Sequence, residues 1–287
     1  MTAKQSIRLG RMQESMLVPL YGRALDSMKR RPILKDTKAL EIVRSIDWDF
    51  ERFNQKRRTV GCTLRTAVFD ECVRDFLSRY PEGTVVEIGA GLNTRFERLD
   101  NGKVRWFDLD LPDVVDLRLK FFVDNHRRTT LAASVLDADW ISRVRQSPGP
   151  YFFVAEAVFI YLSEPGVKRV LAQIADAFPH LFIAFDTTVQ TVADRENRDH
   201  DRRKLGAHFT WACNDPREIE RWNIGLRLVE SRSLTEIPDA LKARLSWSTR
   251  TSISVLPRLF PKFAQAYRIN LFEGHAEPLP GGNETNR

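Results

Sequence analysis

Apolar residues over the first eighty positions recur at the three- and four-residue spacing of amphipathic helices. Segments 19–34 and 36–50 show this spacing, and the clearest stripe runs from Leu64 to Leu77. Residues 81–83, Pro-Glu-Gly, end that helix. We therefore expect the first sixty residues to be helical and to contain no strand with an alternating pattern.

After residue 83 the pattern changes to short apolar runs that alternate with helical segments. Pro112 opens one such helix, and Ser163-Glu164-Pro165 opens another. Because this alternation is typical of βαβ units, we predict an α/β fold with a buried parallel sheet. The expected strands are Thr84–Gly89, Val104–Asp110, Thr129–Val135, Tyr151–Glu156, Leu181–Thr187, Leu226–Ser231 and Tyr267–Phe272.

The last third of the chain is less regular. A polar helix is expected from Gln190 to Lys204, and residues 237–262 are expected to be helical but broken at Pro257 and Pro261. The polar, Pro- and Gly-rich end predicts a disordered tail. The expected organisation is a helical N-terminal cap over 1–62, one α/β domain over 63–277 with cap insertions near 190–211 and 237–262, and a tail over 278–287.

Composition agrees with a folded cytoplasmic protein, since 43% of residues are hydrophobic and 29% are charged. The three cysteines lie far apart without a C-x-x-C pair, which predicts neither a disulfide framework nor a zinc site. No run approaches the roughly 18 apolar residues of a membrane helix, so we expect no membrane partner. The net charge of +7 is spread along the chain and does not by itself predict nucleic-acid binding.

The segment TVVEIGAGLNTRF (84–96) places Glu87, Gly89 and Gly91 where a buried strand is expected to end. Glycines there let the backbone turn tightly and approach a ligand. In open α/β sheets, ligands bind at the carboxyl ends of the strands. An ordinary strand-to-helix turn also uses glycine, so this motif alone leaves both interpretations open.

Acidic residues end the next strands. Asp108 and Asp110 lie about twenty residues after the glycines, where a carboxylate can hold ribose hydroxyls. We assign that role to Asp110, with Asp108 as the alternative, although Asp110 could also begin the following helix. Asp137 is placed to accept from an adenine amino group or to cap a helix. Glu156 ends an apolar run, where a charge is costly unless it is paired or lines a cleft.

The same residues discriminate between nucleoside cofactors. The third glycine of a dinucleotide fingerprint is replaced by Thr94. Glu87, just before the turn, would repel a pyrophosphate but suits a ligand with an amine or a sulfonium. The sequence therefore predicts S-adenosyl-L-methionine rather than NAD.

At this point the sequence resembles the leucine carboxyl methyltransferase-like family, and within it a bacterial branch similar to the tetracenomycin-type polyketide O-methyltransferases. The resemblance runs from Pro19 to Phe272. Its markers are TLRTAVFDECVRDFL, VVEIGAGLNTRFERL, RWFDLDLPDVVDLR, LDADW, VAEAVFIYL and HFTW. It implies the class I (Rossmann-like) methyltransferase fold: a seven-stranded sheet, parallel except for one strand near the edge, with helices on both faces and a helical N-terminal cap.

The resemblance also implies roles for individual residues. Arg65 would grip the methionine carboxylate of the cofactor, as a guanidinium can do with two parallel hydrogen bonds. Arg23 would reach the same carboxylate from the N-terminal cap. The other implied cofactor contacts are Gly89 and Gly91 at the turn, Asp110 at the ribose, Leu136 and Asp137 at the adenine, and Glu156 near the amino-acid end.

We therefore expect an S-adenosylmethionine-dependent O-methyltransferase that acts on a carboxylate or hydroxyl of a small molecule, and the resemblance points to a polyketide-type metabolite. Methyl transfer depends mainly on holding the acceptor in line in a dry site. An ionised carboxylate needs no general base, whereas a hydroxyl benefits from one. His208 and Tyr161 are the candidate bases. A structural histidine and a packing tyrosine are the alternative interpretations.

Other functions make different demands on the sequence. A protein C-terminal carboxyl methyltransferase is the nearer alternative, because the eukaryotic side of the family acts on a protein C-terminus. A nucleic-acid base methyltransferase would want an Asn/Asp-Pro-Pro-aromatic loop after the fourth strand, where this chain reads AEAVFI. A non-catalytic binding protein and a dehydrogenase are the remaining alternatives. We expect a small-molecule acceptor, no nucleic acid and no metal, and the sequence does not predict the oligomeric state.

Overall fold

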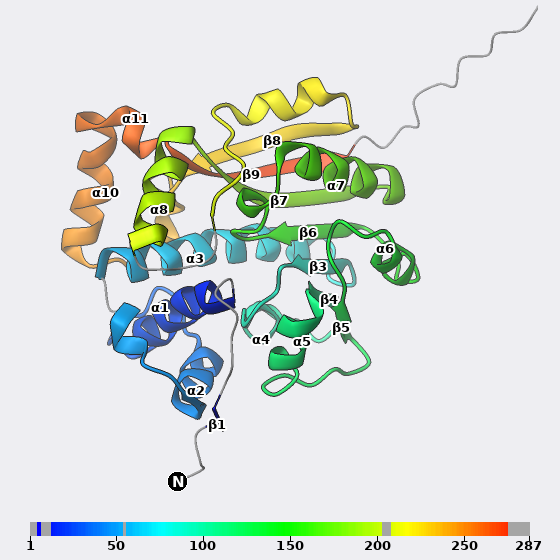
Figure 1. Cartoon of the computed structure of the whole chain (residues 1–287), viewed down its shortest axis with the longest axis horizontal. Coiled ribbons are helices and arrows are strands. Elements are labelled where there is room, and N and C mark those ends of the chain that lie inside the picture. Colours follow the sequence, from blue (N-terminus) through cyan, green and yellow to red (C-terminus); the bar gives the residue numbers. More distant parts are fainter. Residues whose placement is uncertain (1–4, 7–12, 54–55, 203–207, 275–287) are drawn as a thin grey trace, which may run out of the picture.

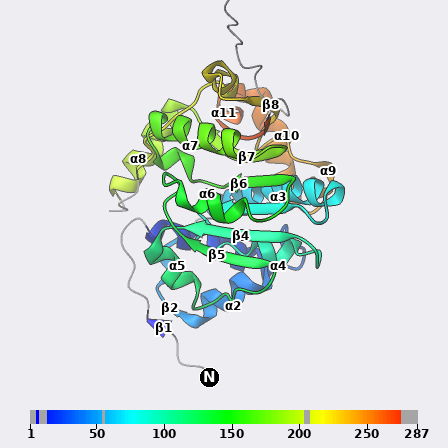
Figure 2. The same ribbon diagram turned by 90° about the vertical axis from the view of Figure 1, so that its right-hand side faces the viewer.

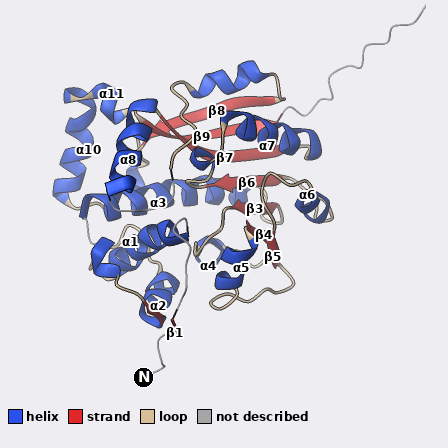
Figure 3. Ribbon diagram, in the orientation of Figure 1, coloured by secondary structure: helices blue, strands red, loops and turns tan. Residues whose placement is uncertain are grey.

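The computed structural model describes residues 5–6, 13–53, 56–202 and 208–274 of the 287-residue chain. A seven-stranded sheet with the strand order β5-β4-β3-β6-β7-β9-β8 forms its centre (Figures 1 and 3). All expected strands are present, with ends within three residues of the prediction. They are β3 (Thr84–Ile88), β4 (Arg105–Asp110), β5 (Arg128–Ala132), β6 (Tyr151–Ala155), β7 (Leu181–Thr188), β8 (Leu226–Ser233) and β9 (Tyr267–Gly274).

The sheet is parallel except at β9, which pairs antiparallel with both β7 and β8. This confirms the single antiparallel strand near the edge. Strands β3 and β6 are buried along their whole length, because helices cover both faces of a parallel sheet. Their carboxyl ends meet at one edge of the sheet.

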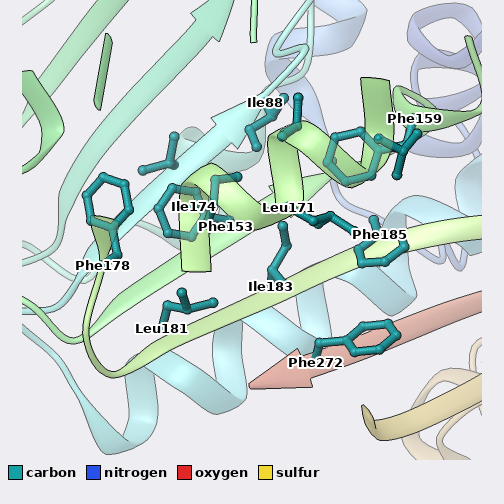
Figure 4. Close-up of a cluster of buried hydrophobic side chains, with 14 of the residues drawn as sticks. Ile88, Phe153, Phe159, Leu171, Ile174, Phe178, Leu181, Ile183, Phe185 and Phe272 are labelled. Carbon is teal, nitrogen blue, oxygen red and sulfur yellow. The ribbon is translucent and has the colours of Figure 1, made fainter. Parts of the chain in front are cut away.

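Helices pack on the two faces as two separate hydrophobic clusters, and Figure 2 shows α3 and α7 on opposite sides of the sheet. One face carries α3 (Lys56–Arg79) and α4 (Arg95–Leu99), and the other carries α6 (Asp139–Val144) and α7 (Glu164–Ala177). Figure 4 shows Leu171 and Ile174 of α7 over Phe153 of β6 and Phe185 of β7. The ring of Phe185 stacks on that of Phe272, with 5.2 Å between centroids.

The N-terminal region is a helical layer of α1 (Leu17–Ser27) and α2 (Thr37–Ser45), with the short 3-10 helices η1 (Gln13–Met16) and η2 (Phe50–Phe53). Its own hydrophobic cluster also takes in Leu117 from α5 (Pro112–Arg118). The sequence predicts no strand with an alternating pattern here, and the two short strands of this region, β1 (Gln5–Ser6) and β2 (Ile46–Asp47), pair in parallel. Each is only two residues long and therefore has no periodic signal.

Helix α3 begins at Lys56, two turns before the predicted Leu64, and it runs across the expected boundary between residues 62 and 63. The added turns begin with Lys-Arg-Arg and contain no apolar stripe, so the sequence pattern did not predict them.

The connection between β8 and β9 holds α9 (Asp239–Lys242), α10 (Trp247–Leu259) and α11 (Pro261–Ala264). The predicted break at Pro261 is present, but the break at Pro257 was wrong, because α10 runs two residues beyond it. The amide hydrogen that proline lacks falls in the last turn, where its loss disturbs little of the helix.

The remaining elements are η3 (Phe159–Tyr161), α8 (Gln190–Arg202) and η4 (Pro216–Trp222). The predicted tail over 278–287 lies outside the described residues. Among the helices of the described ranges, none has the length and apolar character to cross a bilayer.

Candidate active site

A cavity of about 590 Å³ lies at the carboxyl ends of the central strands. Its walls come from α1, α3, the turn after β3, the ends of β4, β5 and β6, and one face of α8. This is the position where open α/β sheets bind ligands. None of the residues 237–262, for which the sequence predicts a cap insertion, lines the cavity.

The glycine turn after β3 forms the floor of the cavity. Gly89 and Gly91 have φ angles of +64° and +45°, a region that L-residues with side chains rarely adopt. The N–H groups of Gly89 and Ala90 both donate to the carbonyl of Leu109, at 2.8 and 3.2 Å. A Cβ added at Gly89 would overlap the side chain of Val158. The turn therefore requires glycine for its conformation and for its close packing.

Asp110 lines the cavity at the end of β4. The N–H of Gly91 donates to its Oδ2 at 2.6 Å, and the N–H of Leu111 donates to its Oδ1 at 2.7 Å. Burial raises the pKa of Asp110, and these two donors oppose that effect. The carboxylate is thus fixed in orientation by backbone on both sides.

Asp108, the alternative ribose ligand, does not line the cavity. It is 1% exposed and pairs with Arg118 at 2.9 Å and Arg128 at 2.7 Å. The indole N–H of Trp106 donates to its other oxygen at 3.1 Å. The structure therefore places Asp110, and not Asp108, at the cavity wall.

Glu156, at the end of β6, lines the cavity beside Arg65 of α3. Its carboxylate accepts from Arg65 Nε at 2.9 Å, Thr66 Oγ1 at 2.8 Å and Arg95 Nη2 at 2.6 Å. Burial works to raise its pKa, but the guanidinium groups of Arg65, Arg95 and Arg23 together lower the pKa of Glu156 to about 2. The group is therefore ionised at neutral pH.

Arg95 is a fully buried residue that sequence reasoning did not single out. It pairs with Glu156, with Asp70 at 2.9 Å and with Glu87. Glu87 lies behind the cavity wall and does not line it. Burial raises the pKa of Glu87 to about 7 even though Arg95 opposes this. Its Oε2 atom is buried without a hydrogen bond among the described residues.

Arg23 reaches the cavity from α1, as the resemblance implied for the N-terminal cap. Its Nη2 donates to the carbonyl of Leu92 at 2.8 Å, and its Nε pairs with Asp36 at 3.0 Å. Asp36 also pairs with Arg98 of α4 at 2.9 Å. These contacts hold the helical N-terminal layer against the glycine turn.

A second pair that the sequence did not reveal stands at the end of β7 and the start of β9. Asp186 is fully buried, accepts the N–H of Ala157 at 3.0 Å and accepts the hydroxyl of Tyr267. Burial raises the pKa of Asp186 to about 6, against the opposing charge of Arg65. Tyr267 lines the cavity, and its hydroxyl accepts from Arg65 Nη1 at 3.3 Å.

The two candidate bases lie in different surroundings. Tyr161 lines the cavity with its ring edge-on to Phe209 at 5.3 Å, and burial raises its pKa to about 12. His208 is exposed and does not line the cavity. Its Nε2 lies 2.7 Å from Asp201. A different histidine, His200 of α8, is 7% exposed and does line it.

The two residues predicted to contact the adenine are not the ones that line the cavity. Leu136 and Asp137 do not line the cavity, and Asp137 is exposed. The preceding residues Ser134 and Val135 line it instead. The sequence pattern located the loop after β5 but not the residues in it that face the cavity.

The sheet order, the antiparallel β9 and the glycine turn beneath a cavity define a class I methyltransferase fold. A protein of Streptomyces avermitilis has the same fold, with a TM-score of 0.60 and 14% identity over 93% of this chain and 100% of that one. A candidate methyltransferase of Thermobifida fusca aligns with a TM-score of 0.55 and 21% identity over 76% of this chain and 83% of its own.

Residues 17–175 match the family model of leucine carboxyl methyltransferase. Over 84% of its length the chain is 32% identical to the tetracenomycin polyketide synthesis O-methyltransferase TcmP of Streptomyces glaucescens, of which it covers 89%. It is also 27% identical, over 79% of its length, to 84% of the S-adenosyl-L-methionine-dependent methyltransferase dpfgK of Gibberella zeae. The chain belongs to the leucine carboxyl methyltransferase family. It is an enzyme that uses S-adenosyl-L-methionine.

Proposed function

We propose that this protein transfers the methyl group of S-adenosylmethionine to an oxygen of a small organic acceptor held in the same cavity. The observation that carries the proposal is that one cavity is lined by the Asp110 carboxylate and by the Glu156 carboxylate paired with the Arg65 guanidinium at 2.9 Å. A nucleoside with a carboxylate, an amine and a sulfonium has groups that match each of them. The name of the Streptomyces glaucescens relative supports an O-methyl product and a polyketide-type acceptor.

The cavity fits this cofactor in shape and in donor set. Gly89 and Gly91 line the cavity with backbone that carries no side chain, which suits close approach of a ligand. We assign the ribose hydroxyls to Asp110 and the adenine to the wall formed by Ser134 and Val135. Arg65 uses Nε and Nη1 for its protein contacts, and Nη2 makes no hydrogen bond within the described residues. That atom is available for the cofactor carboxylate.

The acceptor half of the cavity is formed by α8 and the residues that face it. Val192, Glu196 and His200 recur every four residues and so share the face of α8 that lines the cavity. Phe209 and Tyr161 complete this half. This supports an acceptor cap near 190–211 and gives no such support to one near 237–262.

When bound, the cofactor supplies a methyl group on a positively charged sulfur. The apolar and aromatic wall excludes water and holds the acceptor oxygen in line with that methyl. Tyr161, whose pKa is about 12, keeps its proton at neutral pH and serves as a hydrogen-bond donor rather than as a base. We assign the removal of a proton from a hydroxyl acceptor to His200 rather than His208; a carboxylate acceptor would not need it.

Titration calorimetry and label transfer test this proposal. We expect saturable heat with S-adenosylmethionine and S-adenosylhomocysteine and none with NAD. With methyl-labelled cofactor and a bacterial extract, the label should enter the organic-soluble fraction. A lack of saturable heat with either sulfur nucleoside would remove the proposal. Label found in protein would assign the chain to protein carboxyl methylation instead.

A further inference from the structure

The connection between β8 and β9 displays an apolar face to solvent. Helix α10 has no buried residue. Five large apolar side chains of α10, α11 and the residue between them stand exposed, and Figure 1 shows these two helices (orange) at the edge of the molecule. They are Trp247 at 81%, Val255 at 39%, Leu259 at 65%, Phe260 at 60% and Phe263 at 55%, and we call them the α10–α11 patch.

The arrangement of α10 explains why the patch is exposed. Trp247, Val255 and Leu259 are spaced by eight and four residues, so they lie along one side of the helix. Ile253 points the other way and packs against the hydrophobic cluster under α3 and α9. The helix is therefore attached to the protein by its opposite side. The patch residues do not line the cavity, so the substrate site gives no reason for their exposure.

The segment of chain that carries the patch has charges of one sign. Residues 240–272 contain six Lys or Arg and no Asp or Glu. Arg250, Arg258 and Lys262 are exposed and form no ion pair with any residue in the described part of the chain. An occupant must therefore offer negative charge together with an apolar phase. Two copies of the patch placed face to face would bring like charges together, which opposes self-association.

A helix with Trp, Phe and Leu on one side and unpaired Arg and Lys beside them has the character of helices that lie in the interface of a membrane. Aromatic rings suit the headgroup level, and arginine and lysine suit anionic headgroups. We propose that the α10–α11 patch docks this protein on the surface of an anionic phospholipid bilayer. This proposal departs from the sequence-based prediction of no membrane partner, which rested on the lack of an apolar run long enough to span a bilayer, whereas this contact needs only one exposed helical face.

Sedimentation of the full chain with lipid vesicles tests the proposal. We expect binding to equimolar phosphatidylglycerol and phosphatidylcholine at low salt, release at high salt, and no binding to phosphatidylcholine alone. Replacing Trp247, Leu259 and Phe260 together by Ser should lower partitioning about tenfold or more, and Arg258→Glu with Lys262→Glu should do the same. Val123→Ser is the matched control, because Val123 is also 81% exposed but lies outside the patch.

Affinity for S-adenosylhomocysteine should be unchanged in every variant, which shows that each one is folded. The proposal is overturned by a lack of binding to anionic vesicles, by equal binding to neutral vesicles, or by patch variants that sediment like the wild type. A dimer that the Ser variant breaks, without vesicle binding, would assign the patch to a second copy. Binding to soluble polyglutamate but not to vesicles would assign it to an acidic protein.

Discussion

At the scale of single residues, Asp110 shows how backbone can prepare a side chain for a ligand. Two amide groups hold its carboxylate at the cavity wall. Asp110→Asn keeps the shape of the side chain but removes the charge that strengthens hydrogen bonds from ribose hydroxyls. We expect the affinity for S-adenosylhomocysteine, measured by calorimetry, to fall about 10- to 100-fold.

Asp116→Asn is the matched control, since Asp116 lies six residues further along the chain, in α5, and is exposed. It should bind like the wild type. Equal affinity in both variants would show that Asp110 does not hold the cofactor.

Ionisation of Glu156 makes the free energy of unfolding depend on pH in the acid range. Its pKa of about 2 in the folded protein lies below the ordinary value of 4.5. Its ionised form therefore stabilises the fold above pH 4.5, and this contribution, about 3 kcal/mol, is lost as the pH falls toward 2. Denaturant unfolding of Glu156→Gln should show a weaker loss of stability over that window than the wild type.

Glu164→Gln, at an exposed position in the first turn of α7, should keep the wild-type slope. A Glu156→Gln slope equal to that of the wild type would mean that the three arginines do not act on this carboxylate as the geometry indicates.

At the scale of elements, the turn between β3 and α4 has no space for a side chain at Gly89. Gly89→Ala meets both a positive φ and the side chain of Val158. We expect a loss of about 2–4 kcal/mol in the free energy of unfolding. Gly102 has a φ of +80° and no atom within 4 Å of an added Cβ, so Gly102→Ala tests the effect of backbone conformation alone. We expect this variant to lose about 1 kcal/mol in the free energy of unfolding. Similar losses in the two variants would contradict the close packing at Gly89.

The strands were predictable because a buried parallel strand is a continuous apolar run between turn residues, as in β3 and β6. The start of α3 and the continuation of α10 past Pro257 were not, because one lacks an apolar stripe and the other depends on where the helix ends. Local pattern therefore located elements better than it located their ends.

From local pattern alone the charged site was predictable only where a residue stands at a strand end, whereas Arg65 and Arg23 were predicted from the family resemblance. Asp110 and Glu156 could be found in this way. Arg95 pairs with Asp70, 25 positions away, and with Glu156, 61 positions away. A pattern of neighbouring residues cannot predict contacts over such separations. His200 and His208 both lie in or beside the same polar segment, and only the packed helix shows which one lines the cavity.

At the scale of the whole molecule, the buried charges make cofactor binding depend on pH. Glu87, with a pKa of about 7, and Asp186, with a pKa of about 6, are both raised by burial. A cationic ligand nearby favours their ionised forms, so binding should release protons. We expect the affinity for S-adenosylmethionine to rise between about pH 6 and pH 8, with proton release visible as a buffer-dependent heat in calorimetry.

Glu87→Gln should flatten this dependence with the same ligand, which separates the protein's titration from that of the cofactor. A profile for Glu87→Gln that matches the wild type would show that Glu87 is not coupled to the bound cation.

Arg95 pairs with carboxylates on α3, on β3 and directly after β6. It therefore links the Glu156 side of the cavity to three elements at once. Val192, Glu196, His200 and Phe209, by contrast, belong to a single connection between two strands. On the proposed function, variation within that one connection changes which acceptor is methylated while the residues around Arg95 stay the same. A library varied at those four positions should therefore yield enzymes with new acceptors.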